Sequence, residues 1–587
     1  MLLEKVLLSG NEAIARGAYE AGARLVAAYP GTPSTEIAET TATFKEMYTE
    51  WSPNEKVALE VATGAALAGA WSMAAMKHVG VNVASDPLMT VSYMEIDGAL
   101  VLVSADDPGM WSSQNEQDNR YWARFAKIPL LEPSDSQEAK DLTVEAFRLS
   151  HEFHAPVLIR TTTRLSHTRC PVTLLERVMV PQGPGPGQRL TLVPEKTVMI
   201  PANAKRRHPL VEQRLEALAA AAEASPFNRI ENPDSTGPAF ITSGIPYTYV
   251  KEAFPGSPVL KLGFSYPLPL KLIREFVAGR KEVYVIEELD PLVETELKAT
   301  GFQVTGKDRL SKVDEYSTTM LQQAFGEPAA PAPKPVPGLP PRPPLLCAGC
   351  PHRGVLYALA LQKAVVLGDI GCYTLGVVKP LETVHSCTCM GASIGHAHGM
   401  EKALGREVTR KVVAMIGDST FFHSGMTPLL GVAYNNGSTK TVIVDNLTTA
   451  MTGHQGNPGS GFDASGNPTK KADLVALVKA LGIDDVTVID PYDLKTTKAA
   501  VKRLLESDAP AVIISRRECA LLRTAQRRPP AVASKDTCTA CGLCLKLGCP
   551  ALYKADGKTQ VDVTLCNGCT MCIQVCPFGA IKEGDPQ

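Results

Sequence analysis

Val412-Val-Ala-Met-Ile-Gly-Asp-Ser419 and, after 25 intervening residues, Asp445-Asn-Leu-Thr448 decide the fold of this chain. The apolar run at 412–416 predicts a buried strand, and the run at 441–444 predicts a second one just before the other polar turn. Open parallel sheets bind their ligands at the carboxyl ends of the strands, so both turns should meet at one sheet edge. A hard cation such as Mg2+ prefers oxygen ligands and usually bridges phosphate oxygens. The two stretches therefore predict an α/β domain with a metal and phosphate site.

The same spacing resembles the thiamine diphosphate motif, in which Gly-Asp-Gly or Gly-Asp-Ser precedes an Asn-containing turn. The resemblance implies three Mg2+ ligands: the Asp418 carboxylate, the side-chain oxygen of Asn446 and the main-chain carbonyl of Thr448. Gly417 and Ser419 are expected to contact the cofactor. A lone Gly-Asp-Ser is a common turn, so the second half of the motif carries the prediction.

Further cofactor contacts are expected in two glycine-containing turns. Met390-Gly391-Ala-Ser-Ile-Gly395 should open a helix whose amide groups face the diphosphate, although close packing of a helix on the sheet explains the same glycines. Gly371, Cys372 and Tyr373 follow the predicted strand at 365–369 and are expected beside the cofactor.

Thiamine chemistry also needs a glutamate that hydrogen-bonds the pyrimidine N1′. In this superfamily it comes from a separate pyrimidine-binding domain, near the start of a small-residue helix. Glu60 fits as the single acid of the apolar stretch at 57–66. A buried glutamate without a partner is costly, which favours a catalytic role. The alternative is an exposed acid on an amphipathic helix.

The last fifty residues hold two cysteine runs, each closing on Cys-Pro: Cys538-x2-Cys541-x2-Cys544-x4-Cys549 and Cys566-x2-Cys569-x2-Cys572-x3-Cys576. In bacterial-type ferredoxins, three close-spaced cysteines hold one [4Fe–4S] cluster and the cysteine before proline ligates the other. This pattern assigns one cluster to Cys538, Cys541, Cys544 and Cys576, and the second to Cys549, Cys566, Cys569 and Cys572. The first run has one residue more than usual before its final cysteine, within 545–548. Zinc knuckles or disulfides explain the duplicated spacing poorly.

The first half of the chain is expected to contain two α/β units. Residues 1–180 should form the pyrimidine-binding domain, with strands at 25–29, 79–84 and 99–104 and a helical stretch at 64–76. Residues 181–234 are interpreted as a connecting segment with one helix near 211–224. A smaller domain, similar to the transketolase C-terminal domain, is expected at 235–326, with strands at 239–242, 259–262 and 282–287.

The second half begins after a proline-rich run. Residues 327–344 can bury little and should form an extended, semi-rigid linker. Residues 345–528 are predicted to be the diphosphate-binding domain, with strands at 365–369, 412–416, 441–444 and 511–515. Residues 529–587 form the ferredoxin module. The fold class is thus α/β, with doubly wound thiamine-binding domains and a small iron–sulfur domain.

The composition excludes several partners. With 59 Lys and Arg against 61 Asp and Glu, the chain has no charge excess that would favour nucleic acid or an anionic membrane. No apolar run approaches the ~20 residues of a spanning helix, and the first ten residues do not resemble a signal peptide. Thiols bound to iron fit a reducing compartment, so a cytoplasmic protein is expected.

At this point the chain resembles the 2-oxoacid:ferredoxin oxidoreductases, and most closely the large (alpha) subunits of the indolepyruvate type. The resemblance is carried by the fused ferredoxin module and by three sequence motifs: Tyr29-Pro-Gly-Thr-Pro-Ser-Thr35, Ser112-Ser-Gln-Asn-Glu-Gln-Asp118 and Leu346-Cys-Ala-Gly-Cys-Pro-His-Arg353. The resemblance implies a third, proximal [4Fe–4S] cluster beside the thiamine, with ligands Cys347, Cys350, Cys372 and Cys519.

The family implies that an arylpyruvate, coenzyme A and two oxidised ferredoxins give aryl-acetyl-CoA, CO2 and two reduced ferredoxins. Each cubane takes one electron, so oxidation proceeds in single-electron steps. A smaller beta subunit, which carries the gamma-type catalytic domain, is expected as a partner in a heterodimer or an α2β2 assembly. Anaerobic metabolism is the implied setting.

Thr32, a catalytic candidate, and Pro33 are expected to position the 2-oxoacid. Substrate or coenzyme contacts are expected at Gln114, Asn115 and Arg120, where a helix-capping turn is an equal alternative. Met451 and His454 are candidates for an aromatic pocket. Branched-chain 2-oxoacids or pyruvate are alternative substrates. Two further readings are a non-oxidative thiamine-dependent decarboxylase and a subunit that only relays electrons.

Overall fold

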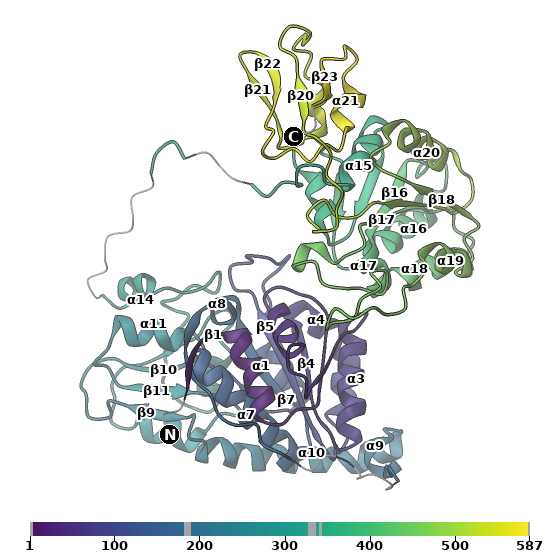
Figure 1. Cartoon of the computed structure of the whole chain (residues 1–587). Helices are drawn as coiled ribbons and strands as arrows, with labels where there is room; N and C mark the ends of the chain where they lie inside the picture. The colour runs from purple at the N-terminus through teal and green to yellow at the C-terminus, as the bar shows by residue number, and fades with distance from the viewer. Residues whose placement is uncertain (1–3, 181–182, 184–188, 327–335, 340–342, 585–587) are drawn as a thin grey trace. The chain divides into compact units, whose positions relative to one another are not determined.

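The computed structural model describes residues 4–180, 183, 189–326, 336–339 and 343–584. The chain divides into two compact units, residues 1–335 and 336–587, within the expected proline-rich linker. Most of that linker and the Pro-Gly residues at 184–187 lie outside the described residues. Figure 1 shows both units, each built from sheets covered by helices.

A seven-stranded sheet forms the centre of the first unit. Its strand order is β12-β6-β7-β5-β4-β2-β3, and all neighbours pair in parallel except β12 with β6. The strands are β2 (Leu25–Ala28), β3 (Tyr48–Trp51), β4 (Trp71–Lys77), β5 (Ala99–Asp106), β6 (Leu130–Leu131), β7 (Val157–Thr162) and β12 (Phe264–Tyr266). Val101 and Val103 of β5 pack on one face, while Leu100 and Leu102 pack on the other. Because both faces are buried, this sheet has the near-continuous apolar strands of a parallel α/β fold.

Helices surround this sheet, and a two-stranded ribbon of β1 (Lys5–Ser9) and β8 (Arg169–Thr173) lies beside it. Figure 1 shows α1, α7 and α3 running alongside its strands. The helices are α1 (Gly10–Glu20), α2 (Thr35–Thr41), α3 (Glu55–Leu67), α4 (His78–Val83), α5 (Ser85–Val91), α6 (Arg120–Ala126), α7 (Ser136–Phe153), α8 (Thr163–His167), α9 (Pro194–Thr197) and α10 (Pro201–Ala224).

Two predicted elements were assigned the wrong type of secondary structure. The predicted helix at 64–76 is the end of α3 followed by β4, and the predicted strand at 79–84 is α4. A central parallel strand buried on both faces shows no alternation of apolar and polar residues, so the small-residue run 71–76 cannot be told from a buried helix by its pattern. The connecting helix is also longer than expected, because α10 begins at Pro201.

The smaller α/β domain contains a four-stranded sheet of order β13-β10-β11-β9. Its strands are β9 (Arg229–Glu231), β10 (Ala239–Ser243), β11 (Val259–Leu262) and β13 (Val283–Ile286), and its helices are α11 (Pro246–Ala253), α12 (Leu270–Val277), α13 (Leu292–Ala299) and α14 (Thr318–Phe325). All three predicted strands are present. The segment 235–326 is not separate from the first domain, however, since β12 pairs with β6 of the larger sheet.

The second unit contains a six-stranded, fully parallel sheet of order β15-β14-β16-β17-β19-β18. The strands are β14 (Val365–Gly368), β15 (Val384–Cys387), β16 (Val412–Gly417), β17 (Lys440–Asp445), β18 (Asp485–Ile489) and β19 (Ala511–Arg516). Its helices are α15 (His352–Leu361), α16 (Ala392–Leu404), α17 (Asp418–Thr420), α18 (Met426–Tyr434), α19 (Leu474–Ala480) and α20 (Leu494–Glu506). The four strands predicted here all form.

The C-terminal module belongs to the same compact unit. It consists of two small antiparallel ribbons, β20 (Ala531–Ala533) with β23 (Ile581–Glu583) and β21 (Leu552–Ala555) with β22 (Lys558–Val561), and the short helix α21 (Met571–Val575). Leu547 and Met571 of the module share one apolar cluster with Leu346 and Leu356 of the neighbouring domain. This continuous core holds the module against α15.

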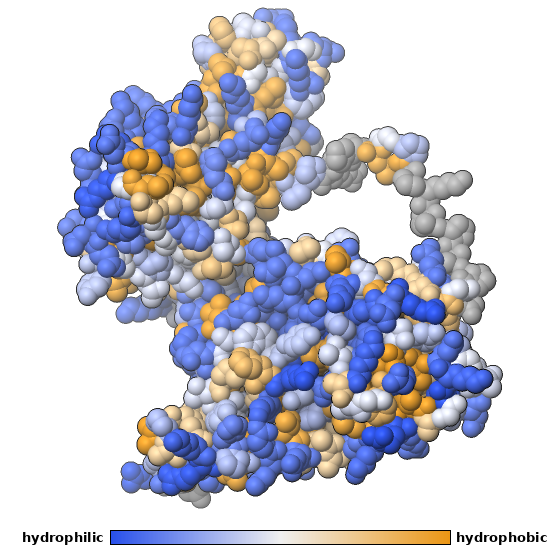
Figure 2. All heavy atoms as spheres, turned by 180° about the vertical axis from the view of Figure 1, so that it is seen from behind, coloured by the Kyte–Doolittle hydropathy of each residue, from blue (hydrophilic) through white to orange (hydrophobic). Residues whose placement is uncertain are grey.

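The surface is mainly hydrophilic on the face shown in Figure 2, with scattered apolar patches. None of the described helices combines the length and the apolar character needed to cross a bilayer.

Candidate active site

The two halves of the opening motif meet at the carboxyl edge of the six-stranded sheet. Asp418 follows β16 directly, and Asn446 follows the neighbouring β17. One terminal atom of the Asn446 amide lies 3.3 Å from Asp418 Oδ1 and 2.7 Å from the Thr448 carbonyl oxygen. With nitrogen at that position, the amide donates to both oxygens. With oxygen at that position, three oxygen atoms face one another. They repel one another when no cation lies between them, and they are the kind of ligands that Mg2+ prefers.

The electrostatics of the Asp418 turn also indicate a cation site. Asp418 is 3% exposed, and burial together with the nearby Asp445 carboxylate raises its pKa. Its carboxylate accepts hydrogen bonds from the Ser419 amide at 2.8 Å and from the Asn457 side-chain amide at 3.5 Å. A buried carboxylate supported only by neutral donors is costly unless a cation joins it. In the described part of the chain, no three His, Cys, Asp or Glu side chains converge on a single metal ion, and the set here uses amide and carbonyl oxygens beside one carboxylate. These residues fit Mg2+.

The glycine-rich run opens a helix as expected. Gly391 has φ +89° and precedes α16, and a Cβ there would lie 2.6 Å from the Ser424 carbonyl oxygen, so only glycine fits. The first amide groups of α16, however, point to Asp369 at the end of β14: Ser393 N donates to it at 3.3 Å. In this structure, the N-terminus of α16 donates its hydrogen bonds to the Asp369 carboxylate. Its expected contact with a diphosphate stays a prediction.

The turn 371–373 lies against the same edge. The Tyr373 ring is buried, and a Cβ added at Gly417 would stand 3.1 Å from it. His352 packs edge-on against the same ring at 5.9 Å. The predicted contacts Gly371, Cys372 and Tyr373 therefore adjoin the metal turn.

The four cysteines expected around a proximal cluster come together in this domain. Burial raises the pKa of Cys372 to about 11, and the neighbouring Cys519 and Cys347 add to the rise. Burial raises the pKa of Cys350 to about 12, with Cys372 and Cys347 also nearby. Cys519, whose position alone suggested a role, also contacts His454, with Sγ 3.5 Å from Nε2. Four neighbouring thiols fit an iron–sulfur cluster, which removes their protons on binding.

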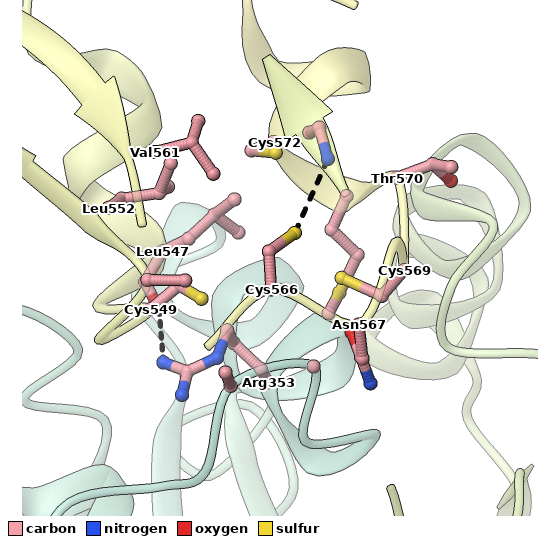
Figure 3. Close-up of a pocket in the computed structure, with 15 residues that line it drawn as sticks. Arg353, Leu547, Cys549, Leu552, Val561, Cys566, Asn567, Cys569, Thr570 and Cys572 are labelled. Carbon is pink, nitrogen blue, oxygen red and sulfur yellow. Dashed lines mark hydrogen bonds between the residues drawn. The ribbon is translucent and has the colours of Figure 1, made fainter. Parts of the chain in front are cut away.

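The eight terminal cysteines separate into two pockets. Cys549, Cys566, Cys569 and Cys572 line one, and Cys538, Cys541, Cys544 and Cys576 line the other. Each pocket thus takes its fourth cysteine from the opposite run, which is the exchange that the spacing predicts. Figure 3 shows the sulfur atoms of the first set directed into their pocket. Main-chain amides support two of the sulfurs: Ala531 N lies 3.4 Å from Cys566 Sγ, and Ala580 N lies 3.3 Å from Cys576 Sγ.

Glu60 is not the buried acid that was expected. Its side chain is 44% exposed and forms an i,i+4 ion pair with Lys56. Glu55, the first residue of the same helix, is 6% exposed instead and packs against Gly80, where a Cβ would lie 2.8 Å from its Oε1. Helix α3 starts at the carboxyl edge of the sheet, and five residues carry Glu60 about 7.5 Å along the helix from there. The Asn54 side chain caps this helix by accepting from Val57 N, and such an N-cap residue is the kind of signal that could have located the helix start.

The remaining predicted contacts divide into two groups. Thr32 lies in the loop after β2, where its carbonyl accepts from Ser112 Oγ at 3.2 Å, and Lys77 Nζ reaches the Ser112 carbonyl at 2.5 Å. Gln114 and Asn115 are exposed in the same region. Lys77 was missed by the sequence reasoning because it ends a strand that was read as helix.

Arg120 is wrong as a substrate contact. It is 1% exposed, donates to Asp118 at 2.8 Å and pairs with Glu287 at 2.5 Å. Two further hydrogen bonds reach the carbonyls of Glu288 and Asp290. Its donors are taken by Asp118 and by the loop after β13, so Arg120 ties the start of α6 to the smaller sheet.

Comparison with known proteins decides the family. The chain is 44% identical to "Indolepyruvate oxidoreductase subunit IorA" of Pyrococcus horikoshii, over 99% of this chain and 98% of that protein. It is 43% identical to the protein of the same name from Archaeoglobus fulgidus, over 99% of this chain and 97% of that protein. The chain belongs to the IorA family of indolepyruvate oxidoreductase subunits.

This IorA-family chain also matches three family models. Residues 16–225 match "Pyruvate flavodoxin/ferredoxin oxidoreductase, thiamine diP-bdg", residues 369–515 match "Thiamine pyrophosphate enzyme, C-terminal TPP binding domain", and residues 559–582 match "4Fe-4S binding domain". A partial relative, "2-oxoglutarate synthase subunit KorA" of Methanothermobacter thermautotrophicus, is 32% identical over 32% of this chain and 52% of that protein. Among solved structures, a 2-oxoglutarate:ferredoxin oxidoreductase from Magnetococcus marinus has a TM-score of 0.44 and 17% identity, over 55% of this chain and 66% of that one.

The family assignment confirms several predictions. The chain is an α/β subunit of a 2-oxoacid:ferredoxin oxidoreductase, with thiamine pyrophosphate and 4Fe–4S binding domains. Its domains support oxidative decarboxylation of a 2-oxoacid, and the family implies the use of ferredoxin and coenzyme A. The matched 4Fe–4S segment contains only the second cysteine run, so the first run depends on the spacing and the pocket geometry.

Proposed function

We propose that this chain is the large subunit of an enzyme that oxidatively decarboxylates arylpyruvates to aryl-acetyl-CoA and passes the electrons to ferredoxin. Indolepyruvate, phenylpyruvate and 4-hydroxyphenylpyruvate are the substrate class, supported by full-length similarity to proteins named indolepyruvate oxidoreductase subunit IorA. One observation carries the redox half of the proposal: the Cys519 amide donates to the carbonyl oxygen of Asn446 at 3.1 Å. The metal turn and a proximal cysteine are therefore direct neighbours.

The proposed cofactors are thiamine diphosphate, Mg2+ and three [4Fe–4S] clusters. When bound, thiamine supplies the nucleophile and electron sink for decarboxylation, and each cluster accepts one electron. Asp418, Asn446 and Thr448 would hold the metal. The ligands of the clusters are the proximal set Cys347, Cys350, Cys372 and Cys519 and the two pocket sets of the terminal module.

Within the chain, we assign the proton exchange at the pyrimidine N1′ to Glu55 in place of Glu60. Glu55 is buried at the sheet edge where ligands bind, whereas Glu60 is exposed and paired with Lys56. A buried carboxyl group can share a proton with a ring nitrogen without competition from water.

Thr32 and Lys77 are proposed to bind the carboxylate end of the 2-oxoacid. Burial lowers the pKa of Lys77 to about 8, with Asp107 opposing the decrease. The ammonium group is therefore still charged near neutral pH and can pair with an anionic substrate. Met451, which is 49% exposed, is a candidate for the rim of the aryl pocket because methionine adapts to irregular apolar shapes.

The proposed assembly includes a smaller beta subunit with the gamma-type catalytic domain, as a heterodimer or an α2β2 complex, in the cytoplasm. Ferredoxin and coenzyme A are the soluble partners. A subunit that only relays electrons is a poor alternative because the thiamine domains match over residues 16–225 and 369–515. A non-oxidative decarboxylase leaves the neighbouring cysteines Cys347, Cys350 and Cys372 without a role.

The test is a viologen-reduction assay on the anaerobically purified complex of both subunits. Aryl, branched-chain and short 2-oxoacids, including 2-oxoglutarate, are compared with and without coenzyme A. We expect the highest kcat/KM with arylpyruvates, strict dependence on coenzyme A, and about twelve iron atoms per chain, four for each cluster. Activity with pyruvate or 2-oxoglutarate alone rejects the substrate class. Product formation without reduction of the acceptor rejects the reaction.

A further inference from the structure

Arg353 is a fully buried cation that has no carboxylate partner among the residues that the structure describes. It is the second residue of α15 and is 1% exposed. Its guanidinium donates to three main-chain carbonyl oxygens, those of Leu547 at 2.6 Å, Leu346 at 2.8 Å and Cys347 at 3.0 Å. Arg353 Nε is buried and has no hydrogen-bond partner within the described residues. Carbonyl dipoles offset part of the cost of burying this charge, and a counter-anion would offset the rest.

Cysteine sulfurs are the groups positioned to supply that anion. Arg353 lines the same pocket as Cys549, Cys566, Cys569 and Cys572 (Figure 3), which measures about 400 Å³ including the part open to solvent. Its guanidinium also donates to the main-chain carbonyl of Cys347, a member of the proximal set, at 3.0 Å. Arg353 thus lies beside residues of both the proximal set and the neighbouring terminal set.

The loop 545–548 explains how the arginine is held. This loop contains the extra residue of the first cysteine run, and its Leu547 carbonyl accepts the shortest of the three hydrogen bonds of Arg353. Gly548 has φ +66°, and a Cβ there would lie 2.8 Å from Pro380 and 3.3 Å from Arg353 Nη1. A side chain at 548 would therefore push the loop away from the guanidinium.

A second contact brings two cysteine loops together. Gly349, between Cys347 and Cys350, has φ +64°, and a Cβ there would lie 2.0 Å from the Asn567 side chain. Asn567 lies between Cys566 and Cys569, and its Oδ1 is buried without a partner in the described structure. The proximal loop and the terminal loop are thus in direct contact, with Arg353 beside them.

We propose that Arg353 is a positioning residue for electron transfer, whose buried guanidinium is neutralised by the cluster at Cys549, Cys566, Cys569 and Cys572, and that the loop 545–548 seats this cluster beside the proximal one. The inference rests on the cluster assignment proposed above. A cubane with four thiolates is anionic and gains one more negative charge when it is reduced. A buried cation next to it therefore favours the reduced state and raises its reduction potential.

Two substitutions separate charge from hydrogen bonding. Arg353→Gln removes the charge and keeps a donor, whereas Arg353→Lys keeps the charge and loses the fork that reaches several carbonyls. Lys546→Gln is the matched control, because it removes an exposed charge of the same sign from the same loop. All are produced anaerobically as the two-subunit complex, and the clusters are titrated by EPR-monitored reduction alongside iron and sulfide analysis.

Arg353→Gln should lower the equilibrium constant for reduction of one cluster by roughly tenfold. This change corresponds to a decrease of ~59 mV in the reduction potential of a one-electron couple. Arg353→Lys should keep most of the wild-type potential, and Lys546→Gln should not change it. Loss of four irons in Arg353→Gln but not in Arg353→Lys also supports the inference, because it shows that the cluster needs a positive charge at position 353. Equal behaviour of Gln and Lys variants, or unchanged potentials in Arg353→Gln with full iron content, overturns the inference and leaves the proposed function intact. A wild-type complex that lacks the iron of this cluster instead rejects the cluster assignment itself.

Discussion

Arg120 and Arg353 are both 1% exposed, but they are surrounded differently. In the first unit, Arg120 meets the carboxylates of Asp118 and Glu287, and Arg160 pairs with Asp106 at 2.8 Å. In the second unit, Arg353 meets only carbonyl oxygens, and Asp418 meets only neutral donors in the part of the chain that is described. Buried charges that are matched inside the chain stabilise its fold. Those that are not matched mark places where a cofactor supplies the opposite charge.

The same contrast appears within a single helix. Glu60 is an exposed acid paired with a lysine, and Glu55 is a buried acid at the ligand-binding edge. Glu55→Gln should lower kcat by roughly 10²- to 10⁴-fold, the range for loss of a positioned proton-transfer group, with little change in thiamine affinity. Glu60→Gln should leave kcat within about twofold, since exposed pairs contribute little. The viologen assay on the assembled complex measures both. A larger loss in Glu60→Gln than in Glu55→Gln would restore the original assignment.

Arg120 tests the matched side of the comparison. Arg120→Gln leaves two buried carboxylates unpaired and should destabilise the first unit by about 3–5 kcal/mol. Urea unfolding of the apo chain measures this change. Arg124→Gln, at a residue that is 48% exposed, is the control and should cost under about 1 kcal/mol. A stable Arg120→Gln protein with a raised KM would instead return Arg120 to the substrate site.

Asp418 tests the unmatched side. Asp418→Asn should weaken binding of thiamine diphosphate with Mg2+ by at least ~100-fold, because it removes a metal ligand rather than an outer partner. The apo chain should be no less stable, since the substitution removes a buried charge that lacks a cation. Calorimetric titration and thermal unfolding give the two readouts, with the exposed Asp484→Asn as control. Loss of apo stability without loss of affinity would show that Asp418 acts only in folding.

Lys77 differs from these arginines, because its ammonium group donates to a main-chain carbonyl, and the buried Asp107 carboxylate acts on it without a direct ion pair among the described residues. Lys77→Met should raise the KM for the 2-oxoacid by about tenfold with kcat less affected, which corresponds to ~1.4 kcal/mol of binding. In the wild type, the KM should rise as the pH increases through about 8, because the ammonium loses its proton there. Lys77→Arg should stay charged and remove this pH dependence. A flat wild-type profile across that range contradicts the assignment.

Sequence patterns predicted much of the fold for identifiable reasons. The apolar runs before Asp418 and Asp445 are strands because both faces of a central parallel sheet are buried, and the polar turns after them lie at its carboxyl edge. The eight terminal cysteines could be grouped because the two-cluster exchange is fixed by their spacing. The same uniform burial made β4 and α4 ambiguous, since neither shows a period.

By itself, the sequence determined most of the elements, the two polar turns at 417–419 and 445–448 and the family, because these depend on local spacing and on residues that lie close together along the chain. Tertiary structure decided which charges are balanced. It placed Glu287, from the loop after β13, against Arg120, exposed Glu60 and buried Glu55 on one helix, and brought the loop 545–548 onto Arg353. The cost of burying a charge depends on every group around it in space, and residues far apart in the sequence provide most of those groups.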